Sequence, residues 1–204
     1  MYSTFKLSRM DQKQQIDTIQ QMLERTRHRV HRDSVYYLLW GWLVFAATAI
    51  QYVLLTQLEW NNYHWITWPI LMPIGALWSM LIGRKMEKLA GHTTLLDRVM
   101  GYLWGGMVMG ILFSILMSSR LGWSNSYILI MLFYAIGTFI SGRILRFRPL
   151  IYGGLFSLLL ILSVLVFPAL LASFQQNLII LALSIVATYL IPGYLLRANK
   201  EAYV

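Results

Sequence analysis

Long apolar runs separated by short polar stretches dominate the chain after residue 34. A helix needs about 20 apolar residues to cross the roughly 30 Å hydrocarbon core of a bilayer. Six runs approach this length, and each is apolar on all sides, unlike an amphipathic surface helix. We therefore predict an all-α fold, a bundle of six transmembrane helices within residues 35–197: residues 35–55, 65–82, 99–117, 127–145, 150–171 and 178–196.

The composition supports a membrane protein over a soluble one. The chain has 204 residues, of which 58% are hydrophobic and only 12% are charged. Soluble domains carry about 25% charged residues, so a water-exposed surface could not be covered here. The absence of cysteine excludes disulfides, thiolate metal sites and a cysteine nucleophile.

The positive charges predict the orientation of the bundle. With six spans, every Lys and Arg except Arg120 falls on one side of the membrane. The positive-inside rule makes that side cytoplasmic, together with both termini and the tail 198–204. Residues 1–33 are charged and lack the apolar core of a cleaved signal peptide.

Residues 1–34 are predicted to form a cytoplasmic amphipathic helix. Ser8 and Asp11 have the spacing of a capping box. A narrow apolar stripe then recurs at steps of three and four residues: Ile16, Ile19, Leu23 and Val30. Three interpretations stay open for this stripe, since it could pack on the bundle, pair with a cytoplasmic protein or a second copy, or lie on the membrane. In the last case anionic lipid headgroups would contact four basic residues: Arg25, Arg27, Arg29 and Arg32.

One cluster on this helix has metal-ligating residue types. Glu24, His28 and His31 share a helix face, and a carboxylate with two imidazoles can hold a divalent ion. The neighbouring arginines repel a cation, so a solvated Glu–His pair is the favoured interpretation. A pH-sensing role for the two histidines is a further hypothesis. We predict no bound metal and no cofactor.

The predicted spans contain no Asp, Glu, Lys or His away from their ends. Buried ionisable residues mark proton relays, ion paths and intramembrane catalysis. Their absence argues against a proton-coupled transporter and against an enzyme. Nucleic-acid binding is not predicted either, because the positive-inside rule already explains the basic charge.

Glycines and prolines predict where the helices approach each other or bend. Two overlapping small-residue pairs on the third span predict close packing within the chain or across a dimer: Gly101, Gly105, Gly106 and Gly110. Prolines predict kinks in the second, fifth and sixth spans: Pro69, Pro73, Pro168 and Pro192. Similar residues open the odd spans and close the even ones, which suggests three parallel helical hairpins.

Several segments resemble a family of uncharacterised small bacterial integral membrane proteins. They are residues 22–26 (MLERT), 37–45 (YLLWGWLVF), 68–73 (WPILMP), 83–85 (GRK) and 97–104 (DRVMGYLW). The resemblance covers the first half of the chain well and the second half loosely. It implies an inner-membrane location and the same six-span topology, but no activity, substrate or site residue.

Two functions follow from these patterns. The favoured one is a non-enzymatic inner-membrane protein with a sensory, regulatory or accessory role, exerted through the N-terminal helix. The alternative is an uncoupled channel or carrier for a small neutral or lipid-like solute, because broken helices can build a midplane binding site.

Overall fold

The computed structural model describes residues 33–57, 63–90, 95–167 and 173–199. Every regular element in these ranges is helical, and six helices are long and apolar enough to cross a membrane. The prediction of six spans is therefore confirmed, and the chain is a multi-pass membrane protein. The predicted helix 1–34, apart from its last two residues, and most of the tail 198–204 lie outside the described residues.

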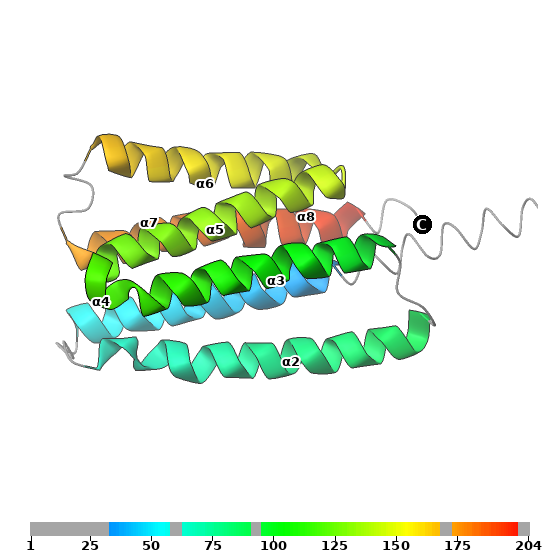
Figure 1. Cartoon of the computed structure of the whole chain (residues 1–204), viewed down its shortest axis with the longest axis horizontal. Coiled ribbons are helices and arrows are strands. Elements are labelled where there is room, and N and C mark those ends of the chain that lie inside the picture. The colour runs from blue at the N-terminus through cyan, green and yellow to red at the C-terminus, as the bar shows by residue number, and fades with distance from the viewer. Residues whose placement is uncertain (1–32, 58–62, 91–94, 168–172, 200–204) are drawn as a thin grey trace, which may run out of the picture.

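The six spans differ in how they are built. The first is a single helix, Asp33–Thr56, drawn unlabelled in blue to cyan in Figure 1. The second begins with the 3₁₀ turn η1 (His64–Ile66) and continues as α2 (Thr67–Ala90); the third is α3 (Leu95–Leu116). After the short helix α4 (Ser118–Leu121) come the fourth and fifth spans, α5 (Trp123–Ile144) and α6 (Arg148–Val166). The sixth span consists of α7 (Phe174–Ile185), the π-helical turn η3 (Val186–Leu190) and α8 (Ile191–Asn199).

Local sequence explains where the last spans begin and end. The fifth span ends at Val166, short of the predicted residue 171, and Phe167 is non-helical at φ −118° and ψ 80°. A residue that precedes a proline is disfavoured in the helical region, and Pro168 follows directly. The sixth span starts at Phe174, ahead of the predicted residue 178, because Ser173 and Gln176 form a capping box.

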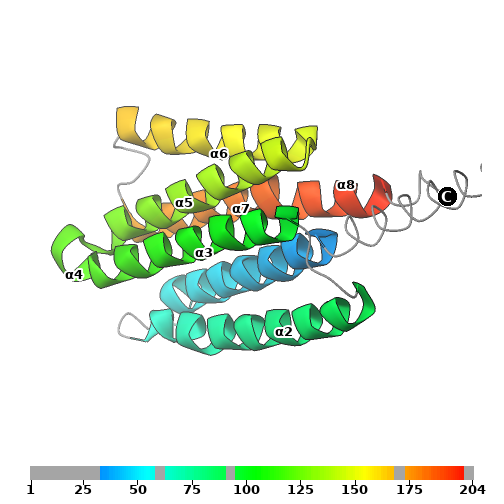
Figure 2. The same ribbon diagram turned by 45° about the vertical axis from the view of Figure 1, so that its right-hand side comes forward.

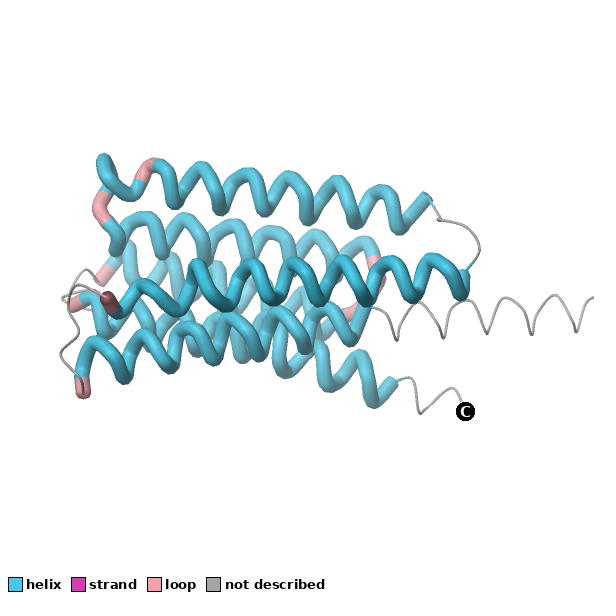
Figure 3. The backbone as a smooth tube through the Cα atoms, turned by 90° about the horizontal axis from the view of Figure 1, so that it is seen from below, coloured by secondary structure: helices cyan, strands magenta, loops and turns pink. Residues whose placement is uncertain are grey.

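The first described span begins, and the last one ends, at the same end of the bundle (Figure 1). We call this the basic end, because the alternating span directions place most of the described basic residues there: Arg84, Lys85, Arg98, Arg143, Arg146, Arg148 and Arg197. Arg120 lies at the opposite end, within α4. Seen from below, the tube of Figure 3 shows the spans running side by side along one common direction.

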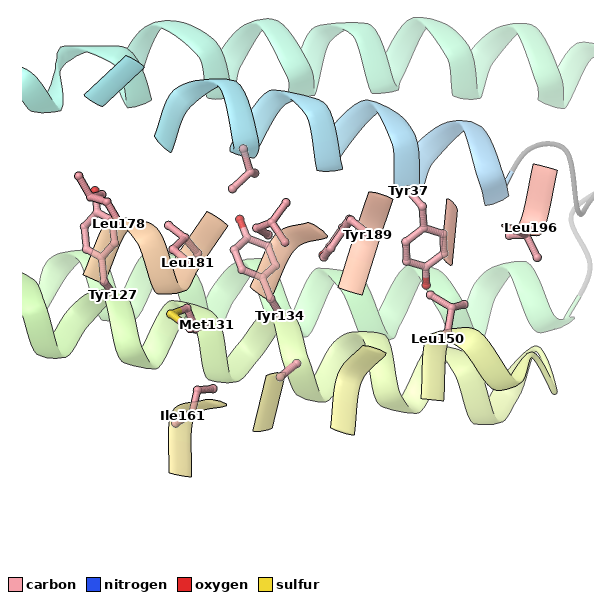
Figure 4. Packing of buried hydrophobic residues seen from close by; sticks show 13 residues of the cluster. Tyr37, Tyr127, Met131, Tyr134, Leu150, Ile161, Leu178, Leu181, Tyr189 and Leu196 are labelled. Carbon is pink, nitrogen blue, oxygen red and sulfur yellow. The ribbon is translucent and has the colours of Figure 1, made fainter. Parts of the chain in front are cut away.

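The core lies between the first span, α5, α6 and the sixth span. α2 and α6 lie on opposite outer sides of the bundle in both Figure 1 and Figure 2. Figure 4 shows the core side chains in a row along the bundle axis, from Tyr127 at the opposite end to Leu196 at the basic end. By contrast, the long apolar side chains of α2 and α3 are largely exposed, including Leu81 and Met109. Such faces suit lipid, which is as apolar as the side chains themselves.

Three glycines allow the closest helix contacts. A Cβ atom at Gly154 of α6 would lie 2.7 Å from the backbone nitrogen of Phe139 in α5. A Cβ at Gly142 of α5 would lie 2.7 Å from the backbone nitrogen of Ile151 in α6. Gly153 meets the backbone carbonyl of Ala187 in η3 in the same way. The contacts of α6 with α5 and with the sixth span therefore depend on the missing side chains.

Candidate functional site

The predicted partner, lipid and metal residues all belong to the N-terminal helix and lie outside the described residues. They are Ile16, Ile19, Leu23 and Val30, then Arg25, Arg27, Arg29 and Arg32, and lastly Glu24, His28 and His31. Those predictions stay predictions. Within the described ranges, no group of three or more His, Asp or Glu side chains is placed to hold a metal ion.

The glycines of the third span behave differently from one another. A Cβ at Gly110 would clash with the ring of Phe133, so this glycine packs α3 against α5. At Gly101, Gly105 and Gly106, a Cβ would meet nothing within 4 Å. Packing within the chain is therefore not the role of these three in the described structure, because they face away from the neighbouring spans. Packing across a dimer stays a prediction.

The predicted proline kinks also differ in their outcome. α2 runs unbroken through Pro73, and Pro69 lies in its first turn, where a missing N–H group has no helical acceptor to lose. Pro168 lies outside the described residues. In the sixth span, the α-helix gives way to the π turn η3, which ends two residues before Pro192. The proline lacks an N–H group and its ring crowds the carbonyl of Thr188, which accounts for the widened turn there.

The most extensive polar arrangement in the described bundle centres on Gln51, in the first span near the opposite end. Its side chain is 1% exposed. Its Oε1 accepts hydrogen bonds from Trp68 Nε1 at 2.6 Å and from Tyr127 Oη at 2.8 Å. Its Nε2 lies 2.9 Å from His64 Nδ1. We call Gln51, His64, Trp68 and Tyr127 the Gln51 joint, since it links the first span to η1, α2 and α5.

Aromatic rings enclose this joint. Trp68 and Tyr127 meet edge to face with ring centroids 5.9 Å apart. The ring of Phe174, at the start of α7, lies with its centroid 5.2 Å from that of Tyr127 and 5.5 Å from that of His64. The sixth span is thereby joined to the same cluster. Such aromatic pairs add about 0.5–1.5 kcal/mol each beyond their buried area.

A second aromatic cluster lies nearer the basic end and joins Tyr37 of the first span to residues of three other spans, two of them by direct ring contact. Its ring lies 6.2 Å from Trp104 of α3 and 5.6 Å from Tyr189 of η3, and Tyr189 in turn lies 5.6 Å from Tyr134 of α5. Figure 4 shows Tyr37 and Tyr189 in the row of core side chains. Three buried hydroxyl groups of this region have no hydrogen-bond partner: those of Tyr37, Thr138 and Ser141.

Asn177 is the other strongly polar side chain in the core. It is 2% exposed, and neither its Oδ1 nor its Nδ2 has a hydrogen-bond partner. It lines a cavity of about 10 Å³ between α5, α6 and α7, together with Tyr127 and apolar side chains such as Met131 and Ile161. A cavity of this size has room for about one water molecule.

Sequence reasoning missed the Gln51 joint and Asn177. Gln51 was recognisable as the most polar residue inside a predicted span, but its partners come from three other elements. Asn177 fell one residue outside the predicted sixth span, so its burial was not expected. A signal for it existed in Ser173 and Gln176, whose spacing marks a helix start.

The Gln51 joint holds the first span, η1, α2 and α5 in a defined arrangement. The buried polar side chains of the described residues are Ser, Thr, Asn and Gln, with none of the charged types. Several of these hydroxyl groups donate a hydrogen bond to a backbone carbonyl one turn earlier in the same helix, as Thr48 does to Val44 and Thr188 to Ser184. Comparison of the chain with protein-family models, with curated proteins and with solved structures gives no match.

Proposed function

We propose that this protein is a non-enzymatic membrane protein that acts by interaction, with a sensory or regulatory role exerted through its N-terminal segment. One observation carries the proposal: the first span, which continues directly from that segment, is contacted along its whole length. At the opposite end Gln51 holds it to three elements, and near the basic end Tyr37 packs against α3 and the sixth span. A rearrangement at the Gln51 joint therefore acts on the helix that leads into residues 1–32.

The basic end is cytoplasmic in this proposal, and the membrane is the bacterial inner membrane. The positive-inside rule supports the orientation, since the basic side chains of the described loops lie at one end of the bundle. The N-terminal helix would then lie in the cytoplasm, close to anionic headgroups. Its apolar stripe would contact a cytoplasmic protein or a second copy of the chain.

The alternative is an uncoupled channel or carrier for a small neutral or lipid-like solute. The π turn η3, with Pro192 beside it and unpaired hydroxyls opposite, favours this function, because such breaks occur at binding sites. The packing argues against it, since the cavity beside Asn177 measures only about 10 Å³. Stopped-flow swelling of proteoliposomes in glycerol and in urea tests this function. Uptake that Pro192→Ala abolishes would favour it over the interaction role.

Photo-crosslinking in native membranes tests the interaction role. A photoreactive amino acid replaces Ile16, Ile19 or Leu23, one at a time. Gln14 and Gln21 serve as controls, because at about 100° per residue they lie on the opposite helix face. The proposal expects one discrete protein adduct from the stripe positions and little from the controls. Adducts to lipid alone, or equal labelling on both faces, would contradict it.

A further inference from the structure

Hydrogen-bonding capacity fixes the orientation of the Gln51 amide. The indole nitrogen of Trp68 can only donate a hydrogen bond, so the atom 2.6 Å from it must be the acceptor Oε1. The donor Nε2 then faces Nδ1 of His64 at 2.9 Å. Nδ1 accepts that bond, which leaves the ring proton on Nε2. The joint therefore requires His64 in its neutral form, as one particular tautomer.

We propose that His64 is a proton-binding site that controls the Gln51 joint. A proton added at Nδ1 turns that atom into a donor that faces the donor Nε2 of Gln51. Turning the amide over does not help, because Nε2 would then face the indole N–H of Trp68. Neither orientation satisfies the joint once His64 is charged, so protonation separates η1 from the first span.

Few other groups around His64 could change their protonation state with pH. The first span presents Gln51 and α7 presents Phe174, neither of which titrates. α5 contributes Tyr127, whose hydroxyl group donates a hydrogen bond to Gln51. A tyrosine titrates at about 10, so it stays protonated throughout the range in which histidine titrates. Among the described residues, no charged side chain acts on the imidazole ring. Glu59 lies in the loop 58–62, outside the described residues, and is therefore included among the variants below.

The direction of the effect follows from these bonds. The Gln51 joint is complete at pH values above the pKa of His64, where the ring is neutral. It is lost as the pH falls below that pKa. An unperturbed histidine titrates at about 6.5. This inference rests on the proposed orientation and function, under which the joint would respond to acidification on the non-cytoplasmic side of the membrane. The readout would be the position of the first span.

Distance measurements between two spin labels test the joint directly. The chain contains no cysteine, so Val53→Cys in the first span and Tyr63→Cys beside η1 can be labelled without further substitutions. Both side chains are exposed, 48% and 62% respectively, so the labels do not disturb the core. The protein is held in lipid nanodiscs at pH of about 7.5 and of about 5, either side of the histidine range.

Matched variants separate the proposed cause from others. His64→Gln keeps an acceptor for Gln51 but cannot take a proton, so its label distances should be short at both pH values. Gln51→Leu removes the joint, so its distances should be long at both. Glu59→Gln should respond like the unmodified chain. A second label pair, Met109→Cys with Leu159→Cys on α3 and α6, should not respond at all, which shows that the bundle stays folded.

The expected result is a rise of about tenfold in the ratio of long to short distances at the lower pH. This corresponds to the loss of one hydrogen bond and the gain of an unsatisfied donor. An unchanged ratio, a response that survives His64→Gln, or one that disappears in Glu59→Gln would each overturn the proposal.

The same samples distinguish this proposal from the proposed function. If the label distances respond but the crosslinks from Ile16, Ile19 and Leu23 are the same at both pH values, the proton site stands and the signalling role fails. If the crosslinks respond and the distances do not, the proton site fails.

Discussion

The contact between α5 and α6 allows the energetic cost of a single methyl group to be worked out. Replacing Gly154 by alanine places a Cβ atom 2.7 Å from the backbone nitrogen of Phe139 and 2.9 Å from both its Cα and the carbonyl oxygen of Ala135. These are backbone atoms of another helix, so no side-chain rotation can relieve the clash. The two helices must instead move apart, at a place where they pack over most of their length.

The change in the free energy of unfolding follows from two opposing contributions. Ordinary contact begins at about 3.4 Å, so α5 and α6 must separate by roughly 0.5–0.7 Å at this point, and overpacking of this kind costs about 1–3 kcal/mol. Alanine is favoured over glycine in a helix by up to about 1 kcal/mol. We expect a net loss of about 1–2 kcal/mol, or a fall in the melting temperature of about 2–8 °C for a chain of this size.

Gly101→Ala is the matched control, because the same substitution on α3 meets nothing within 4 Å. Only the helix-propensity term applies there, so its melting temperature should be unchanged or slightly higher. Both variants are compared in one detergent by thermal unfolding followed through tryptophan fluorescence. Equal stability of the two variants would refute the reasoning. A larger loss for Gly101→Ala would also refute it, and would place a partner on the exposed face of α3.

Three further substitutions test the polar contacts by the same assay. Gln51→Leu leaves its three partners unmatched and should lower stability by about 2–5 kcal/mol, whereas Gln57→Leu, at the exposed end of the same span, should change it little. Asn177→Leu should raise stability by about 1–3 kcal/mol, because it removes a buried amide without partners; a loss would show that the amide holds a water molecule in its cavity. Ser173→Ala removes the capping box of α7 and should cost about 1 kcal/mol, while the exposed Ser119→Ala should cost nothing measurable.

The number of spans could be predicted from the sequence because bilayer thickness sets the length of an apolar run. The span ends were predicted less well, because polar residues can enter a helix where capping or burial stabilises them. Ser34 is fully buried at the start of the first span, and Asn177 lies inside the sixth. Hydropathy alone assigns both to loops.

The helix faces could not be predicted, for a physical reason. In lipid, the outward faces are as apolar as the inward ones, so periodicity does not show which side meets a neighbour. Gly101 and Gly105 have the spacing of a packing motif and face away from the other spans, whereas Gly153 and Gly154 stand in direct helix contacts. The Gln51 joint needs partners from separate elements, and their proximity follows only from the packing of the bundle.

Hydrogen bonds and aromatic packing hold the first span at both ends, but they join it to different elements at each. At Gln51, three hydrogen bonds fix the helix, and each would be lost if the helix moved. In the half of the helix nearer the basic end, Tyr37 contributes aromatic packing. There Tyr36 Oη donates to the carbonyl oxygen of Ser79 at 3.3 Å, and Trp42 Nε1 donates to Tyr194 Oη at 3.0 Å. A shift of the helix near the basic end would therefore break hydrogen bonds to α2 and α8 and also repack the ring of Tyr37. The position of the first span is thus set by contacts at both ends, and loss of the Gln51 joint removes the larger set, three hydrogen bonds to η1, α2 and α5.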